Sequence, residues 1–280
     1  MRILKIPIAD SHHLTAYAFT PAQKARAKVI IAPAMGVTQK YYHALANWLL
    51  EQGFAVTTFD YRGIGESRNR DLRDYQLDVL DWAQLDCSAV LAHVIESGEQ
   101  DIYWLGHSLG GQIFPLIKQI ERVKKVISIS SGTGYWRHNA PQLKNKALLM
   151  WYFIVPLSIR LLGYFPGKKL GIIGDLPKQV ISQWRRWCLH PDYCVGVESE
   201  KVRARFEEIN VPIRSLVFSD DEMLSLRNMQ DLQALFGGAD KQLLTVTPQE
   251  IGVKEIGHLG FFKPQFADNL WPKLLLPELA

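Results

Sequence analysis

The pentapeptide Gly106-His107-Ser108-Leu109-Gly110 constrains the fold of this chain more than any other stretch. An apolar segment, Ile102 to Leu105, precedes it, and a helix-compatible run from Gln112 to Ile120 follows it. Because a G-x-S-x-G pattern between a strand and a helix requires a very tight turn, the serine side chain stands clear of the sheet. The two glycines are expected where a Cβ atom would collide with neighbouring backbone. The sequence therefore predicts a strand, turn and helix that present the serine as a nucleophile.

A serine hydroxyl is a weak nucleophile, so Ser108 needs a base within hydrogen-bond reach and a carboxylate that orients this base. On a turn of this kind the chain order is serine, acid, histidine. Of the later histidines, only His258 follows a late strand, and the glycines beside it favour an exposed loop. His138 and His190 lie in an irregular region and are weaker candidates. His107 is expected to point away from the serine.

The orienting acid is expected after the late strand that ends at Phe218. Three acidic residues stand together there, and all of them qualify by position: Asp220, Asp221 and Glu222. The first of them directly follows the strand and is also placed to hold the turn through its own backbone. The position of the strand end alone leaves the three candidates open.

An oxyanion formed at Ser108 needs two backbone N–H donors. The Leu109 N–H is expected at a helix N-terminus, where negative charge is stabilised. The second donor should come from the loop after the buried strand Val29 to Ala32. Met35, which stands before Gly36, is placed for this role.

Short apolar runs alternate with helix-compatible runs at both ends of the chain, which predicts a mostly parallel, doubly wound α/β sheet. Strands are expected at 4–8, 14–19, 29–32, 55–59, 102–105, 125–129, 213–218 and 243–246. Helices are expected at 41–52, 77–96, 112–120, 228–236 and 265–275. Ligands of such sheets bind beyond the carboxyl ends of strands. The loops that begin at Pro33, Asp60 and Gly106 are therefore expected to line one crevice.

From Thr133 to Phe206 this alternation breaks, and the stretch is rich in tryptophan, tyrosine and proline. We interpret residues 133–206 as a helical insertion between two parts of one core, 1–132 and 207–280. Within it, Ala147 to Leu162 is strongly apolar, but its uncharged portion is too short to span a bilayer. A buried or lid helix is expected there, with no integral membrane segment.

Composition excludes several classes of function. The 280 residues are 48% hydrophobic and 21% charged, which is an ordinary globular composition and is enough for one sizeable core. The net charge of +4 is dispersed without a block of like charge, so nucleic acid is not an expected partner. The first seven residues lack a long apolar region and a cleavage signal, which favours a cytoplasmic protein.

The three cysteines, Cys87, Cys188 and Cys194, form no even disulfide framework, in keeping with a reducing compartment. Cys188, His190 and Cys194 lie close together in the sequence. They lack a fourth ligand and match no familiar zinc spacing, so no metal site is expected.

Together these motifs resemble the α/β-hydrolase superfamily. The resemblance is carried by four stretches: 106–110, 60–67, the acidic cluster 220–222, and Gly257-His258. A narrower likeness is to bacterial predicted α/β-hydrolases of the serine-aminopeptidase-like and monoacylglycerol-lipase-like branch. It rests on 33–37, 163–167, 184–188 and 257–262, and so extends into the insertion.

The resemblance implies a Ser–His–acid triad, an oxyanion hole of backbone N–H groups, no metal and no organic cofactor. It also implies that the insertion is a cap over the active site. In the superfamily pattern the acid lies three positions beyond the residue that closes its strand. Counting from Phe218 gives Asp221, whereas counting from Ser219 gives Glu222. We therefore expect Asp221 as the acid, with Asp220 and Glu222 as alternatives.

The expected catalytic set is Ser108, Asp221 and His258, with Met35 and Leu109 at the oxyanion hole. The expected function is hydrolysis of carboxylic esters or thioesters of apolar small molecules through an acyl-enzyme. Two alternatives stay open at this point. One is a small-peptide aminopeptidase or amidase, and the other is a non-catalytic ligand-binding module on the same fold.

Overall fold

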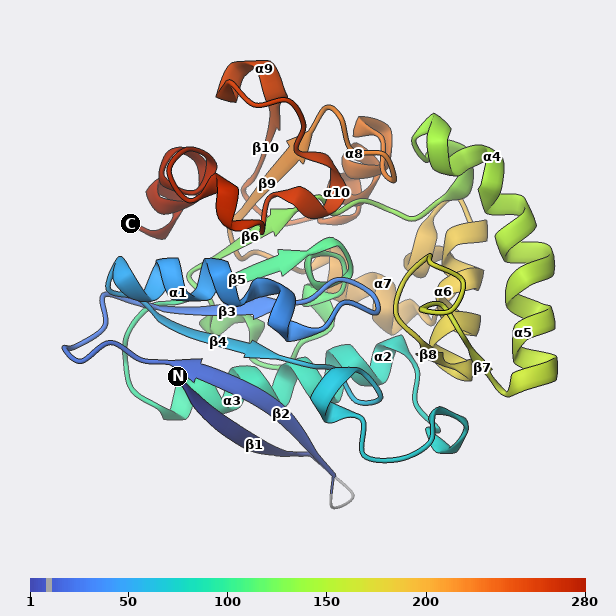
Figure 1. The fold of residues 1–280 in the computed structure, drawn as a ribbon, viewed down its shortest axis with the longest axis horizontal. Coiled ribbons are helices and arrows are strands. Elements are labelled where there is room, and N and C mark those ends of the chain that lie inside the picture. Colours follow the sequence, from blue (N-terminus) through green and yellow to red (C-terminus); the bar gives the residue numbers. More distant parts are fainter. Residues whose placement is uncertain (9–11) are drawn as a thin grey trace.

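The computed structural model describes residues 1–8 and 12–280, so the turn expected around Asp10 and Ser11 lies outside the described residues. In the described part of the chain a single eight-stranded sheet runs through the molecule in the order β1-β2-β4-β3-β5-β6-β9-β10 (Figure 1). Its strands are β1 Arg2–Ile8, β2 His12–Phe19, β3 Lys28–Ala32, β4 Ala55–Phe59, β5 Ile102–His107, β6 Lys125–Ile129, β9 Ile213–Phe218 and β10 Lys241–Val246. β1 and β2 pair antiparallel, as does β2 with β4, and the other pairs are parallel. This confirms the predicted doubly wound, mostly parallel sheet.

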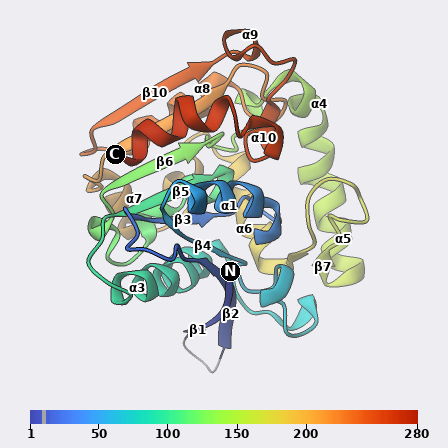
Figure 2. The ribbon, with the colours of Figure 1, turned by 60° about the vertical axis from the view of Figure 1, so that its left-hand side comes forward.

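Helices cover both faces of the sheet (Figures 1 and 2). α1 His43–Glu51 and the C-terminal segment cover one face, and α3 Ser88–Glu96 covers the other. The central strand β5 shows why both faces must be covered, because its successive side chains alternate between two apolar clusters. Ile102 and Trp104 lie in the cluster on the α3 side, whereas Tyr103 and Leu105 lie in the cluster on the α1 side. The remaining short helices of the core are α2 Val79–Asp81, α8 Leu226–Leu235, α9 Pro248–Ile251 and α10 Gly257–Gly260.

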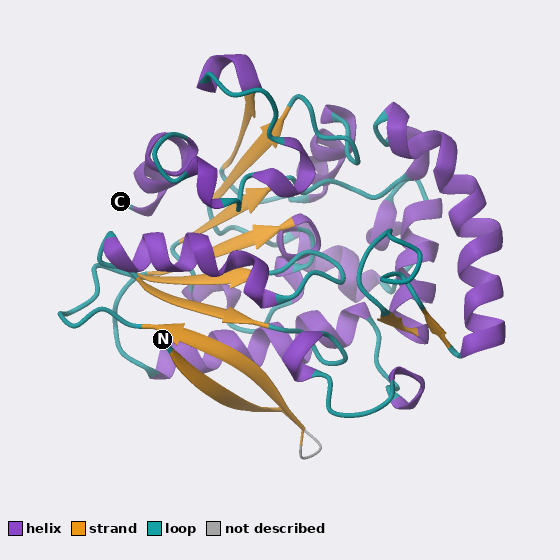
Figure 3. Cartoon of the chain, in the orientation of Figure 1, coloured by secondary structure: helices purple, strands orange, loops and turns teal. Residues whose placement is uncertain are grey.

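The region predicted as an insertion lies over the carboxyl ends of the parallel strands (Figure 1). It contains α4 Pro141–Leu149, α5 Val155–Leu162, the two-residue strands β7 Tyr164–Phe165 and β8 Leu176–Pro177, α6 Lys178–Leu189, and α7 Glu200–Glu207. A π-helical segment, Met150–Ile154, joins α4 to α5, so the two form one continuous helix (Figure 3). The chain leaves the sheet after β6 and returns at β9, and these two strands are neighbours.

The predicted helix from Gln112 to Ile120 is wrong. Three short 3₁₀ turns stand there instead: Ser108–Gly111, Phe114–Leu116 and Ile120–Arg122. Pro115 lacks a backbone N–H in the middle of the run, and Gln119 has a positive φ of 61°, so an α-helix cannot continue through either position.

The apolar run from Ala147 to Leu162 is helical, but it is not buried in the way that its composition predicts. It belongs to a 22-residue helix, Pro141–Leu162, that is long and apolar enough to cross a membrane by length and composition. An 18-residue window of this helix has a mean hydropathy of 1.2. Only 22% of its apolar window is buried. The helix therefore packs one face against the fold and leaves the other face to solvent.

Candidate active site

Ser108 stands on a strained turn at the carboxyl end of β5, the strand between β3 and β6. Its φ of 48° lies in the left-handed region, which a residue with a side chain adopts only when its surroundings enforce it. The surroundings are the two glycines of the pattern. A Cβ on Gly106 would lie 2.4 Å from the Gly110 carbonyl oxygen, and a Cβ on Gly110 would lie 2.3 Å from that of Ala32. The collision predicted from the sequence is confirmed at both positions.

Asp221 and His258 form a buried pair beyond the end of β9. The His258 Nδ1–H donates to Asp221 Oδ2 over 2.8 Å, and the two side chains are 3% and 0% exposed. Asp221 Oδ1 accepts the backbone N–H groups of Met223 and Leu224, each at 2.8 Å. Because both carboxylate oxygens are engaged, the carboxylate is held rigidly and fixes the plane and tautomer of the imidazole. The outer ring nitrogen, Nε2, is left for a partner in the pocket.

The neighbouring acids hold the backbone beside the ring rather than the ring itself. Asp220 Oδ2 accepts the N–H of Ile256 at 2.7 Å, and Glu222 Oε2 accepts the N–H of His258 at 3.0 Å. Asp220 was kept as an alternative acid that could also hold its own turn, but its carboxylate reaches across to the histidine segment. The geometry therefore separates one acid on the imidazole from two acids on the main chain.

His258 does not project from an exposed loop, as its glycine neighbours suggested. It lies in the four-residue helix α10 and is 3% exposed. Gly257 precedes it with a φ of +66°, and a Cβ there would meet Glu222 Oε2 at 2.9 Å. The glycine thus allows the carboxylate of Glu222 to approach the backbone, instead of making the segment project.

A chain of buried hydrogen bonds runs behind the site and was not foreseen from the sequence. The Ala34 N–H donates to the Tyr42 hydroxyl at 2.9 Å, and this hydroxyl lies 2.9 Å from His107 Nδ1. His107 Nε2 lies 3.0 Å from the carbonyl oxygen of His258. A carbonyl oxygen only accepts, so Nε2 carries the hydrogen and Nδ1 accepts from Tyr42.

Burial, followed by the neighbouring His258, lowers the pKa of His107 well below its ordinary value. His107 is therefore neutral, in agreement with this tautomer. Its ring points away from the pocket, as expected for the residue before the serine. The chain of bonds connects the loop after β3 to the histidine segment through the strand that carries Ser108. No local sequence pattern marks Tyr42 for this role, since 65 residues separate it from His107.

The loop after β3 is fixed by tyrosine hydroxyls and by the insertion. The Tyr61 hydroxyl donates to the Pro33 carbonyl oxygen at 3.1 Å, and the Val37 N–H closes a turn onto Ala34 at 3.1 Å. Gly36 has a φ of +69°, and a Cβ there would lie 2.8 Å from the backbone nitrogen of Gly174 in the insertion. The loop is thus held from both sides, with Met35 facing the pocket.

Leu109 is buried and lies in the 3₁₀ turn Ser108–Gly111 rather than at the start of an α-helix. The macrodipole of a full helix is therefore absent from the site within the described residues, and stabilisation of negative charge would rest on individual N–H groups. The roles of Met35 and Leu109 at an oxyanion hole stay a prediction.

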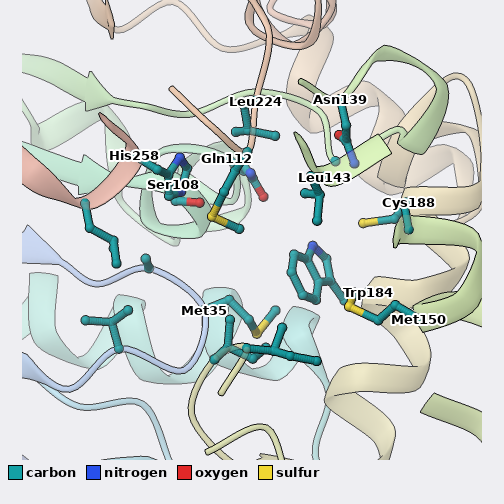
Figure 4. A pocket seen from close by; sticks show the side chains of 18 of the residues that line it. Met35, Ser108, Gln112, Asn139, Leu143, Met150, Trp184, Cys188, Leu224 and His258 are labelled. Carbon is teal, nitrogen blue, oxygen red and sulfur yellow. The ribbon is translucent and has the colours of Figure 1, made fainter. Parts of the chain in front are cut away.

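A cavity opens in front of Ser108 and His258 (Figure 4). The core side contributes Met35, and the insertion contributes an apolar wall that includes Leu143, Met150 and Trp184. Within the described part of the chain, the lining includes no Asp, Glu, Lys or Arg side chain. Figure 4 shows the serine oxygen and the imidazole at one end of this cavity. Such a cavity suits an apolar ligand with its reactive group at the serine.

Two polar side chains interrupt the apolar wall. Gln112 is already engaged, because it donates to the Gly132 carbonyl and accepts from the Tyr193 hydroxyl. Asn139 is 7% exposed, and its Oδ1 is buried without a hydrogen-bond partner among the described residues. Asn139 lies at the wall opposite Ser108 (Figure 4).

The loop that begins at Asp60 does not line this cavity, contrary to the prediction of three loops around one crevice. Asp60 instead organises the loop itself. Its carboxylate accepts the backbone N–H groups of Gln39 at 2.7 Å and Glu66 at 2.9 Å. Arg62 pairs with the fully buried Asp86 at 2.6 Å. The glycine-punctuated loop therefore supports the site from behind and does not face the ligand.

The candidate metal ligands of the insertion do not come together. Cys188 and Cys194 are buried free thiols, and burial raises the pKa of both. His190 Nδ1 accepts the N–H of Asp192. Among the residues that the structure describes, no three His, Cys, Asp or Glu side chains are grouped as metal ligands.

With this geometry in place, comparison with known proteins is informative. Residues 23–161 match the family model Hydrolase_4, which is described as serine aminopeptidase, S33. An uncharacterized protein of Escherichia coli O157:H7, YfhR, is 32% identical over 118 residues, which is 41% of this chain and 40% of the relative. The match therefore spans about two fifths of that relative's length.

Several solved structures share the fold over almost the whole chain. The DcsB complex with its substrate analogue superposes with a TM-score of 0.65 at 16% identity, covering 95% of this chain and 94% of the other. Together with the family match, this fold places the chain in the α/β-hydrolase superfamily. This α/β-hydrolase is also similar to a thermophilic esterase from Thermogutta terrifontis, with a TM-score of 0.61, 14% identity and coverage of 100% and 99%. A monoacylglycerol lipase from Paleococcus ferrophilus superposes with a TM-score of 0.58 at 15% identity, covering 95% of this chain and 98% of the other. The family and the fold together support a hydrolase.

Proposed function

We propose that this α/β-hydrolase is a serine esterase that cleaves carboxylic esters or thioesters of apolar small molecules. The observation that carries the proposal is the pairing of His258 with Asp221 at 2.8 Å beside a strained, pocket-lining Ser108. A buried imidazole whose inner nitrogen is held by a carboxylate is the arrangement that a serine hydroxyl needs for activation.

The proposed reaction begins when Ser108 Oγ attacks the ester carbonyl carbon and His258 Nε2 takes the hydroxyl proton. The carbonyl oxygen becomes an oxyanion, which the Leu109 and Met35 N–H groups stabilise. The C–O bond to the leaving group then breaks, and His258 returns the proton to the departing alcohol or thiol. Water attacks the acyl-enzyme through the same histidine, which releases the acid and restores Ser108.

The lining of the cavity favours an apolar acyl group over a peptide. The family description names an aminopeptidase, and such an enzyme needs a carboxylate to hold the ammonium group of its substrate. The described lining contains none. Two acids of the insertion are engaged elsewhere: Asp175 accepts the N–H of Lys168, and Glu198 accepts the indole N–H of Trp187 at 2.7 Å. Aminopeptidase activity is therefore the second candidate.

The test is turnover of p-nitrophenyl esters of graded acyl length, from acetate to laurate, beside amino-acid p-nitroanilides. We expect ester hydrolysis with a preference for longer acyl groups, and loss of activity in Ser108→Ala. A fluorophosphonate should label wild-type protein once, at Ser108. Faster anilide cleavage would favour the peptidase, and a folded protein with neither turnover nor label would favour a ligand-binding module.

A further inference from the structure

The helix formed by α4 and α5 has two apolar faces, and only one is covered by the fold. Its inner face contributes Ala147, Met150, Trp151 and Val155, all of which are buried. Its outer face carries six large apolar side chains that are between 39% and 69% exposed. We call these residues the apolar stripe: Leu148, Leu149, Tyr152, Phe153, Leu157 and Leu161. A helix that is apolar all round normally lies in a protein core or against lipid.

The charge around this helix is as uneven as its exposure. Residues 141–174 contain five lysines and arginines and no aspartate or glutamate: Lys144, Lys146, Arg160, Lys168 and Lys169. The net charge of the whole chain is only +4, so the formal charges of all residues outside this segment sum to −1. All five cations are exposed. The positive charge of the protein is therefore concentrated beside its most exposed apolar surface.

A groove between α5 and α6 adds to this pattern, and we call it the basic groove. Four cations line it together with Ser182: Arg160, Lys178, Arg185 and Arg186. The Arg185 guanidinium lies 5.4 Å from the ring centre of Tyr152, so the basic groove adjoins the apolar stripe. No acidic side chain belongs to the described lining. Guanidinium and ammonium groups at such a rim match the phosphates of lipid headgroups.

We propose that the outer face of α4 and α5 docks on the surface of an anionic lipid bilayer. The apolar stripe lies in the interfacial region, and the surrounding cations contact lipid phosphates, as in helices that lie in the plane of a membrane. The helix does not span the bilayer, because its inner face is packed against the insertion and the cavity. Figure 1 shows the helix at the outer edge of the described part of the molecule, on the side away from the sheet.

Docking at this face has a consequence for substrate access, which rests on the proposed function. Leu143, Ala147, Met150 and Trp151 line the catalytic cavity from the same helix that carries the stripe. One helix thickness therefore separates the lipid surface from the cavity. Apolar esters that partition into a bilayer would therefore be concentrated close to the catalytic cavity.

The binding test uses Ser108→Ala, so that its outcome is independent of catalysis. The protein is floated with phosphatidylcholine vesicles or with mixed phosphatidylcholine–phosphatidylglycerol vesicles. We expect partitioning onto the mixed vesicles at least about tenfold stronger than onto the neutral ones, decreasing as salt is added. Equal or absent binding to both vesicle types would overturn the proposal.

Two variants locate the surface. Phe153→Glu/Leu161→Glu should weaken partitioning by about tenfold or more, because it places charge in the stripe. The matched control Ile3→Glu/Leu226→Glu changes the net charge equally at exposed apolar residues elsewhere and should bind like the parent. Equal loss in both variants would overturn the assignment of the surface, leaving only a general charge effect.

A charge variant provides an independent check if the stripe variant fails to fold. Arg160→Gln/Lys168→Gln/Lys169→Gln should reduce binding to mixed vesicles and flatten its salt dependence, whereas Lys24→Gln/Lys201→Gln should not. Light scattering without vesicles measures the oligomeric state, and so tests whether a second copy of this chain covers the apolar stripe instead of lipid. A dimer that Phe153→Glu/Leu161→Glu converts to monomer would show that a second copy covers the stripe, and would overturn the lipid proposal.

Discussion

At the scale of single residues, three carboxylates lie near His258, and each contacts a different group of this histidine segment. Asp221 reaches the imidazole Nδ1, whereas Asp220 and Glu222 accept backbone N–H groups. An amide can still accept a backbone N–H, but it cannot stabilise an imidazolium or impose the same tautomer. Replacement of each acid by its amide therefore distinguishes the proposed triad acid from its neighbours.

We expect Asp221→Asn to lower kcat for a p-nitrophenyl ester by about 10²–10⁴, with little change in circular dichroism. Asp220→Asn and Glu222→Gln serve as matched controls and should stay within about tenfold of wild type. Steady-state kinetics on the three purified variants decides between them. A collapse of activity in either control, with Asp221→Asn near wild type, would shift the acid by one position.

His107 carries a prediction about acid stability. Its pKa in the folded protein lies well below the ordinary value of 6.5, chiefly because it is buried. Between the two values the unfolded chain binds a proton that the folded chain does not, so stability falls as pH falls below about 6.5. The slope for one such group approaches about 1.4 kcal/mol per pH unit.

His107→Gln retains an acceptor for Tyr42 and a donor for the His258 carbonyl, but it cannot titrate. We expect its free energy of unfolding in urea to fall less steeply than that of wild type between pH 7 and pH 5. Burial also lowers the pKa of His43, which contributes with the same sign in both proteins and cancels in the comparison. Parallel slopes would show that His107 does not control acid stability.

At the scale of elements, the sequence predicted best those segments whose residue pattern is compatible with only one kind of secondary structure. The strands at 55–59, 125–129 and 213–218 match β4, β6 and β9 residue for residue, because short buried apolar runs between helices have few alternatives. The helix predicted after Ser108 is wrong, since Pro115 interrupts a pattern that otherwise suits a helix.

The residues of the candidate site that belong to local sequence motifs could be predicted from the sequence. The contacts between residues far apart in the chain could not. Ser108 and His258 follow from the glycine pattern and from chain order, whereas the choice of Asp221 among three acids rests on the spacing that the superfamily resemblance implies. The hydrogen bond from Tyr42 to His107 joins elements that no local pattern relates. The exposure of the outer face of α4 and α5 was also not predicted, because the sequence pattern of an apolar helix is the same whether that helix is buried or exposed.

The contact between the loop after β3 and the insertion can be tested with two glycines. Gly36 and Gly171 have nearly equal φ values of +69° and +65°, so alanine at either position incurs a similar conformational cost of about 1–2 kcal/mol. Only the Cβ at Gly36 meets backbone, at 2.8 Å from Gly174, whereas nothing lies within 4 Å of a Cβ at Gly171.

We therefore expect Gly36→Ala to lower both the melting temperature and kcat, because Met35 and its N–H shift with the loop. Gly171→Ala should lower the melting temperature slightly and leave kcat close to wild type. Thermal denaturation and ester kinetics on the two variants provide the measurement. Equal effects in both would mean that only the backbone angle matters at Gly36.

At the scale of the whole molecule, the cavity belongs to both the core and the insertion. The core contributes the reactive end, and the insertion contributes the wall that an acyl chain would contact. Chemistry and substrate range should therefore respond to different parts of the chain. A side chain enlarged on the inner face of α4 should change which acyl lengths fit, without changing the reaction.

Leu143→Trp should lower kcat/KM for long acyl esters by about tenfold or more and spare the acetate ester, since the added ring takes up cavity space. Leu149→Trp adds the same ring on the exposed face of the same helix and should leave the acyl-length profile unchanged. The profile of kcat/KM against chain length for both variants checks this. A uniform loss at every length in Leu143→Trp would indicate a disturbed site instead.

The place at which the insertion joins the sheet also orders events during synthesis. β6 and β9 are neighbours with Val126 opposite Ile213, although the whole insertion lies between them in the chain. Ser108 is therefore synthesised before the insertion, whereas Asp221 and His258 are synthesised after it. A nascent chain carries the proposed nucleophile without its proposed base until the residues beyond β9 have emerged. Any hydrolysis that depends on this pair would begin only after β9 has paired with β6 across the insertion.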